Sequence, residues 1–162
     1  MKKNMIPFFL LIIFGSILFA HSGKMTDKSK EYQAVRQTID NVFGWAVKKD
    51  FTLFFNTIAG DSNFISVTPY KRVKFGAQAV RNDTAFWASP YFKAIRHELY
   101  DVHINFSAGG NVAWFYCVLD DINTWKGQPA NWEKVRWTGV VEKRKGKWRV
   151  VQQHFSFPLQ SE

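Results

Sequence analysis

One carboxylic acid and one histidine in the second half of the chain are the residues best suited to acid–base chemistry. Asp120 follows an apolar run, and His154 lies in an alternating run further on. An acid and a histidine that meet among aromatic side chains shift each other's pKa, and such a pair can move a proton next to a carbonyl group. Asp120 and His154 are therefore the predicted catalytic pair, as would suit an isomerase, a dehydratase or an aldol-type cyclase.

Aromatic and polar side chains are the predicted ligand-binding residues around this pair. Trp137 and Trp114 offer apolar surface, and Tyr116 and His103 can donate a hydrogen bond to a developing enolate. Simpler interpretations stay open for the same residues. The acid can meet water at a strand end, the histidine can be a core residue with backbone partners, and the tryptophans can belong to a core or a dimer interface.

A predicted β-hairpin over residues 131–157 is the frame in which Trp137 and His154 can meet. Two runs rich in Val, Trp and Thr flank Lys145-Gly146, and Gly146 supplies the positive φ of a tight turn. Such a turn places Trp137 opposite His154, on the more apolar side of the sheet. A single β-bulge would send every later side chain to the other face.

A second hairpin is predicted at Gly109-Gly110. It places His103 opposite Tyr116 and Leu99 opposite Asp120, on a side of mixed polarity. The other side is almost wholly apolar and is expected to pack on helices. The mixed side either lines a ligand site or meets water and a partner subunit.

Helical patterns precede these strands. The predicted helices are 30–46, 51–56 (capped by Asp50) and 77–88; the predicted strands before the last hairpin are 63–68, 72–75, 93–107 and 112–122, with a loop at 123–130. Helices followed by antiparallel strands predict an α+β domain. We expect three N-terminal helices packed on a curved, mainly antiparallel sheet that leaves one open mouth.

Composition limits the possible chemistry. The chain of 162 residues suffices for one domain, and 17% aromatic residues suffice for a core and a lined pocket. Cys117 is the single cysteine, which excludes an intramolecular disulfide and a cysteine-rich zinc site. His97 and His103 lie about 20 Å apart along one strand. No metal or cofactor is therefore expected.

The N-terminus has the pattern of a secretory signal peptide. Lys2 and Lys3 precede an apolar run over residues 6–20, and Ala20-His21-Ser22 offers small residues for cleavage. Residues 1–22 are the predicted signal peptide, so a periplasmic or secreted protein is expected. The alternative is an uncleaved anchor, which would be the only membrane attachment. Although the formal charge is +9, nucleic acid is not expected as a partner outside the cytoplasm.

Four stretches resemble a known family: the opening helix, Asp50-Phe51 at the second helix, Asn111-Val112-Ala113-Trp114 at a strand start, and the ending from Gly146 to Ser156 (GKWRVVQQHFS). Together they are similar to the SnoaL-like branch of the nuclear transport factor 2-like (NTF2-like) superfamily, over residues 30–158. The ending also looks like that of the calmodulin-dependent kinase association domain.

The resemblance implies a cone-shaped α+β roll whose helices and curved sheet enclose a pocket. It also implies a homodimer formed through the outer side of the sheet. Members include isomerases, cyclases, dehydratases and hydrolases as well as non-catalytic domains, so the fold alone leaves function open. The leading hypothesis is binding of a small, mostly apolar molecule of unknown identity. The alternatives are a cofactor-independent acid–base enzyme and an assembly module without chemistry.

Overall fold

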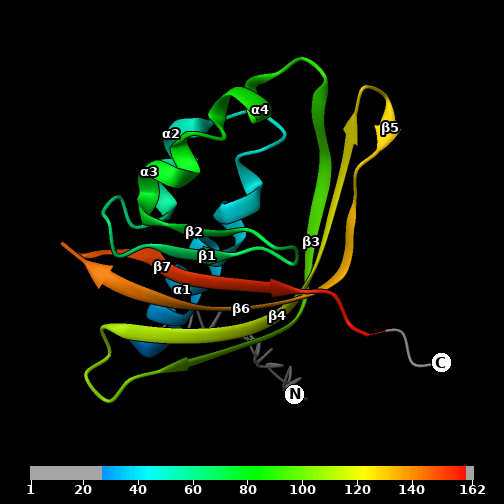
Figure 1. The fold of residues 1–162 in the computed structure, drawn as a ribbon. Coiled ribbons are helices and arrows are strands. Elements are labelled where there is room, and N and C mark those ends of the chain that lie inside the picture. Colours follow the sequence, from blue (N-terminus) through cyan, green and yellow to red (C-terminus); the bar gives the residue numbers. More distant parts are fainter. Residues whose placement is uncertain (1–26, 160–162) are drawn as a thin grey trace, which may run out of the picture.

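A strongly curved sheet forms one side of the molecule, and helices cover its concave face (Figure 1). The computed structural model describes residues 27–159. The elements are α1 (Asp27–Gly44), α2 (Phe51–Thr57), β1 (Ile65–Val67), β2 (Val73–Phe75), α3 (Gly76–Arg81), α4 (Thr84–Ala88), β3 (Phe92–Phe106), β4 (Val112–Trp125), β5 (Gln128–Pro129), β6 (Trp132–Arg144) and β7 (Lys147–Ser156). The predicted signal peptide, residues 1–22, lies outside the described residues.

The strands follow the order β2-β1-β7-β6-β4-β3, and β5 pairs with β4 beside this path. All pairs are antiparallel except β1 with β7, which run parallel. The predicted α+β roll is thus confirmed. Within residues 27–159, no helix is both long enough and apolar enough to cross a membrane.

The first two helices form where the sequence pattern predicts them. In α1, Val35, Ile39 and Val42 recur at spacings of four and three and are buried on the face toward the sheet. Asp50 caps α2, because its carboxylate accepts the main-chain N–H of Leu53 at 2.9 Å. Both helices therefore follow from local signals.

The third predicted helix is two short helices, α3 and α4. The break falls at Asp83, whose carbonyl accepts hydrogen bonds from the N–H groups of Phe86 and Trp87 at 3.0 and 3.2 Å. The Asp83 side chain does not cap α4, because Lys74 and Arg72 occupy its carboxylate. A tertiary ion pair thus replaces a local cap, and 77–88 does not continue as one helix.

β-Bulges bend the sheet, as the path of β3 and β4 in Figure 1 shows. One bulge lies between Tyr100 and His103, beside Asp101 at φ 47°, in the β3–β4 pair. The predicted pairing of His103 with Tyr116 is confirmed. Beyond the bulge the register shifts, so Leu99 faces Leu119 rather than Asp120.

The last hairpin turns where predicted but shifts register further along. Lys145 and Gly146 form the turn, with φ 49° and 76°. A bulge follows between Val140 and Val141, and beyond it Trp137 pairs with Phe155 while His154 pairs with Thr138. The predicted pairing of Trp137 with His154 is wrong, because one extra residue in β7 reverses the side on which later residues lie.

The core between α1 and the sheet is built on aromatic contacts around Trp137. Its ring meets Phe115 edge-on at 5.0 Å and stacks on Phe155 at 5.2 Å. Opposite the Phe115 ring lies Gly139, where a Cβ atom would come within 2.6 Å of Phe115 Cε1 and 2.7 Å of the Gln152 carbonyl oxygen. The absence of a side chain at position 139 is therefore what makes room for Phe115.

Candidate functional site

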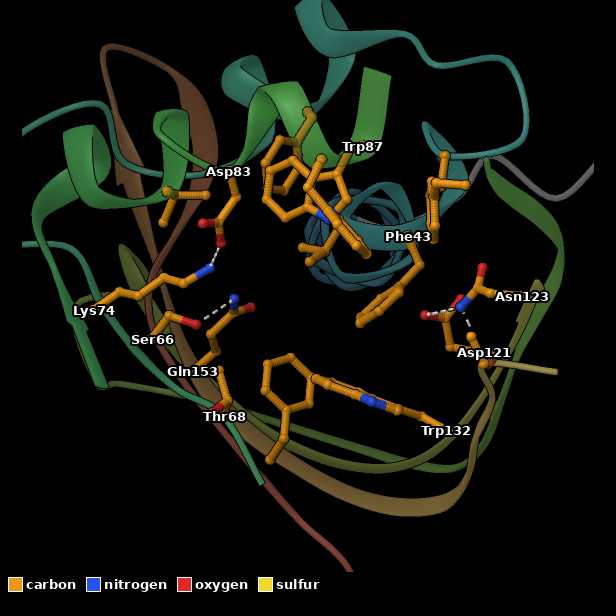
Figure 2. A pocket seen from close by; sticks show the side chains of 18 of the residues that line it. Phe43, Ser66, Thr68, Lys74, Asp83, Trp87, Asp121, Asn123, Trp132 and Gln153 are labelled. Atoms are coloured by element: carbon orange, nitrogen blue, oxygen red, sulfur yellow. Dashed lines mark hydrogen bonds and ion pairs between the residues drawn. The ribbon is translucent and has the colours of Figure 1, made fainter. Parts of the chain in front are cut away.

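A cavity of about 610 Å³ lies between the helices and the concave face of the sheet (Figure 2). Its lining is mainly apolar, and aromatic rings contribute to it from Phe43, Trp45, Phe54, Trp87, Trp132 and Phe155. Polar side chains lie on two opposite sides of this apolar space. Such a lining, apolar with a few placed polar groups, is characteristic of small-molecule sites.

Asp121 and Asn123 form the polar wall on β4. Both lie on the concave face, where Asp121 pairs with Trp132 of β6 and with His97 of β3. Asn123 Nδ2 donates to Asp121 Oδ2 at 2.8 Å, and Asn131 Oδ1 accepts the main-chain N–H of Asn123 at 3.1 Å. These contacts fix the two side chains against the apolar space.

Burial gives Asp121 unusual acid–base properties. Removal from water raises the pKa of Asp121 to about 6, against smaller opposing effects of the Asn123 hydrogen bond and the charge of His97. His97 itself bonds Asp40 of α1, with 3.1 Å between Nε2 and Oδ1. Asp121 can therefore take up or release a proton close to neutral pH while facing the cavity.

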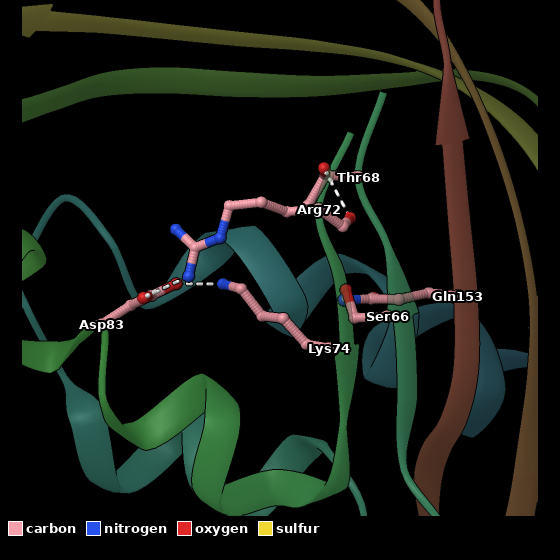
Figure 3. A network of polar contacts seen from close by, with 6 residues as sticks. All are labelled: Ser66, Thr68, Arg72, Lys74, Asp83 and Gln153. Carbon is pink, nitrogen blue, oxygen red and sulfur yellow. Dashed lines mark hydrogen bonds and ion pairs between the residues drawn. The ribbon is translucent and has the colours of Figure 1, made fainter. Parts of the chain in front are cut away.

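The opposite wall carries an ion-pair cluster between the edge hairpin β1–β2 and the junction of α3 and α4 (Figure 3). Asp83 binds Lys74 closely and Arg72 at 3.4 Å. Beside them, Gln153 Nε2 donates to Ser66 Oγ at 3.1 Å. Arg72 is largely exposed at the rim, whereas Lys74 is mostly buried. The positive charge of Lys74 is therefore balanced inside the site.

Aromatic side chains mark the mouth of the cavity. Tyr70, 64% exposed, meets Trp132 and Phe157 edge-on at 6.1 and 5.7 Å. Trp125, which belongs to the predicted loop 123–130, instead ends β4 and stacks on Phe86 at 4.6 Å. Of these two tryptophans, Trp132 is the one that lines the cavity.

Asp120 and His154, the predicted catalytic pair, both lie outside this cavity. Asp120 projects from the opposite side of β4 to Asp121 and accepts hydrogen bonds from the Tyr100 hydroxyl and, at 2.7 Å, from the Lys134 main chain. His154 is exposed on the outer face. The expectation that the two share one pocket is wrong. The bulge between Val140 and Val141 turns His154 outward, whereas Asp120 lies with Tyr116 on the side of β4 that faces away from the cavity.

The four predicted ligand-binding residues also lie away from the cavity. Trp137 is 0% exposed in the core, beneath Phe155. Trp114, Tyr116 and His103 lie on the convex outer face, where Trp114 is 48% exposed. Their alternative interpretation, as core or interface residues, fits these positions. A function for them stays a prediction, but they do not line this cavity.

Sequence reasoning missed all the residues that line the cavity, Asp121 and Asn123 among them. Asp121 is the next residue after the predicted acid, and a strand turns successive side chains to opposite faces. The alternation of Cys117 and Leu119, both buried, continues through Asp121 to Asn123. Extending that alternation along β4 would have pointed to Asp121 rather than Asp120.

A metal site has no ligand set in the part of the chain that the structure describes. Between residues 27 and 159, no group of three or more His, Cys, Asp or Glu side chains could hold an ion. The polar residues of the cavity are instead arranged as amides, hydroxyls and ion pairs.

Helices on a curled sheet, with an apolar cavity between them, define an NTF2-like domain. Residues 35–160 match the SnoaL-like domain, and the chain belongs to this family. The resemblance noted in the sequence is thereby confirmed. None of the curated proteins matches the chain.

Solved structures share this fold at low sequence identity. A proposed dehydratase of the NTF2-like family from Streptomyces avermitilis has a TM-score of 0.67 and 18% identity, over 82% of this chain and 99% of that one. A proposed scytalone dehydratase from Novosphingobium aromaticivorans has a TM-score of 0.66 and 12% identity, over 85% of this chain and 95% of that one. A proposed calcium/calmodulin-dependent kinase II association domain from Exiguobacterium sibiricum has a TM-score of 0.65 and 8% identity, over 86% of this chain and 98% of that one. These similarities establish the fold.

Proposed function

We propose that this SnoaL-like domain binds a small, mostly apolar molecule in its cavity and acts in the periplasm or as a secreted protein. The observation that carries the proposal is the cavity of about 610 Å³ with an aromatic lining and polar groups on two sides. The location rests on the signal-peptide pattern of residues 1–22.

Binding can be tested with N-phenyl-1-naphthylamine, a neutral apolar dye whose emission rises in an apolar site. We expect saturable binding to the purified domain and a raised melting temperature. A ligand at 100 times its Kd adds about 2.7 kcal/mol to the free energy of unfolding. Emission titration and thermal unfolding at several dye concentrations measure the two effects.

Two matched variants tie the dye to the cavity. Ala130 lies exposed at the mouth, so Ala130→Trp should weaken binding about ten-fold or more by blocking entry. Ala108, exposed in the β3–β4 turn, is the control, and Ala108→Trp should bind like the wild type. Equal weakening in both variants, or no binding at all, would contradict the proposal.

A cofactor-independent acid–base enzyme is the second candidate, and Asp121 is the observation that favours it. An acid with a pKa of about 6 inside an apolar cavity is suited to proton transfer near neutral pH. Two of the similar structures are proposed dehydratases. If the protein turns over a substrate, Asp121 is the residue expected to move the proton, rather than Asp120 or His154.

The homodimer is proposed on the outer face of the sheet. Trp114, Tyr116 and Val118 follow one another on the outer side of β4, beside Val140 of β6. Trp114 is 48% exposed on this face, and dimer formation would remove its apolar surface from water. The family's usual mode of association supports the same face.

Sedimentation at micromolar concentration tests the dimer. The wild type should sediment as a dimer, whereas Trp114→Glu should sediment as a monomer, because a charge would be buried without a partner. Tyr91 is 56% exposed and lies in the turn just before β3, so Tyr91→Glu should leave the dimer intact. A monomeric wild type would refute the proposal.

A further inference from the structure

The side-chain oxygen of Asn123 is a buried hydrogen-bond acceptor without a partner among the described residues. Only 5% of Asn123 is exposed. Its orientation is fixed by its neighbours, because Nδ2 faces two acceptors, Asp121 Oδ2 at 2.8 Å and the Asp121 carbonyl oxygen at 3.4 Å. The free atom is therefore Oδ1, and it lacks a donor. A buried acceptor left unpaired is costly, so a donor in the cavity would be strongly favoured.

Asp121 adds a negative charge beside that acceptor. No Lys, Arg or His nitrogen of residues 27–159 lies within ion-pair distance of its carboxylate. The ring of His97, its neighbour across the strand pair, binds Asp40 through Nε2. The wall formed by Asp121 and Asn123 thus offers acceptors and a negative charge to the cavity, with no protein cation in contact.

The positive charges on the other wall do not oppose a cation in the cavity. Figure 2 shows Lys74 across the cavity from Asp121, with its ammonium directed at Asp83. Arg72 also contacts Asp83 and is largely exposed, so solvent screens it. The carboxylate of Asp83 neutralises the charge of Lys74, whereas no cationic side chain of residues 27–159 pairs with Asp121.

Aromatic rings flank the negative wall. Trp132 is the register partner of Asp121, and Phe43 lies with its ring centre 6.3 Å from that of His97, which pairs with Asp121 from the other side. The faces of such rings attract cations. A carboxylate, a free carbonyl oxygen and two aromatic side chains together complement an ammonium group.

We infer that the ligand of the proposed binding function carries a protonated amine on an apolar body, and that Asp121 and Asn123 bind the ammonium. This inference rests on the proposed function and narrows its ligand to amphipathic amines. The ammonium donates to the Asp121 carboxylate and to Asn123 Oδ1. The apolar body occupies the aromatic space toward Trp87 and Phe155.

Three probes that share an indole ring test the charge preference: tryptamine (cation), tryptophol (neutral) and indole-3-acetate (anion). Isothermal titration calorimetry at pH 7.5 on the wild-type domain should give tryptamine an affinity about ten-fold or more above that of tryptophol, because a charge-assisted hydrogen bond outweighs a neutral one. Indole-3-acetate should bind most weakly. Asp121→Asn should reduce the preference for tryptamine over tryptophol to less than about two-fold.

Asp120→Asn is the matched control, since it removes the same charge from the neighbouring residue on the outer face. It should keep the full preference for tryptamine. Equal affinities for the three probes, or a preference that survives in Asp121→Asn, would overturn the inference while the binding function stands. Stronger binding of the anion would also overturn it and would implicate Lys74 and Arg72. Binding of none of the three would count against both the inference and the binding function.

Discussion

Replacing Asp121 by Asn is expected to stabilise the protein at pH 8, by up to about 3 kcal/mol in the free energy of unfolding. Burial raises the pKa of Asp121 from 3.8 to about 6, and each unit corresponds to about 1.4 kcal/mol. The folded protein therefore holds this proton more tightly than the unfolded chain. Ionising the buried acid costs stability, and the neutral amide avoids that cost.

The sign of the pH dependence follows from linkage. Below pH 3.8 Asp121 is protonated in both states, and its replacement by Asn should change stability little. As the pH rises from 3.8 to about 6, the unfolded chain loses its proton first, so the stability of the wild type falls relative to the variant. Above about pH 6 the difference should stay constant. Urea unfolding of both proteins at pH 4 and pH 8 measures it.

Asp120→Asn should show the opposite sign at pH 8. Burial raises the pKa of Asp120, but the hydrogen bonds from the Lys134 main chain and the Tyr100 hydroxyl outweigh it and lower the net pKa. The ionised carboxylate of Asp120 thus stabilises the fold, and its loss should destabilise it. If Asp121→Asn destabilised the protein at pH 8 as much as Asp120→Asn does, the description of Asp121 as an acid without a cationic partner, facing the cavity, would be wrong.

Gly139→Ala is expected to destabilise the protein by about 3 kcal/mol, the upper end of the cost of overpacking a core. The added methyl group would lie 2.6 Å from Phe115 Cε1 and 2.7 Å from the carbonyl oxygen of Gln152. One neighbour is backbone of the adjacent strand, and the other is a ring held against Trp137. Neither can move away without disturbing the sheet or the core. Thermal and urea unfolding measure the loss.

Gly60→Ala is the control for this prediction, because a Cβ atom at position 60 meets no atom within 4 Å. Its effect should stay within about 0.5 kcal/mol. In a Gly139→Ala, Phe115→Leu double variant the smaller side chain relieves part of the clash. The double variant should therefore lose less stability than the sum of the single variants. Additive losses, or a neutral Gly139→Ala, would mean that Phe115 does not require the missing side chain.

Most of the fold could be predicted from local signals. The apolar spacing of α1, the cap at Asp50 and the turn at Lys145-Gly146 each act within a few residues. The order of helices and strands then favours a curved sheet over a helix. Where a tertiary contact competes with a local signal, as Lys74 does for the Asp83 carboxylate, the sequence prediction was less accurate.

The candidate site depended on details that pattern reasoning does not reach. One bulge in the last hairpin moved His154 outward and set Gln153 into the cavity wall. The position of a bulge depends on how the whole sheet bends around α1. Apolar and polar residues alternate regularly on both sides of the bulge, so the local sequence does not reveal it. The choice between Asp120 and Asp121 needed the correct side of one strand. The predicted catalytic residues therefore lie on the correct strands, β4 and β7, but on the wrong face of the sheet.

The parallel pairing of β1 with β7 has a consequence for how the molecule is made. Ile65 of β1 binds alongside Gln152 of β7, so two segments far apart in the chain share an edge. During synthesis the ribosome releases β1 long before β7 exists, and β1 then has only β2 as a strand partner. Strand pairing over such a separation is slow, because a long loop must close first. Nascent chains consequently lack the finished sheet, and with it the cavity wall that Gln153 of β7 contributes, until β7 has been translated.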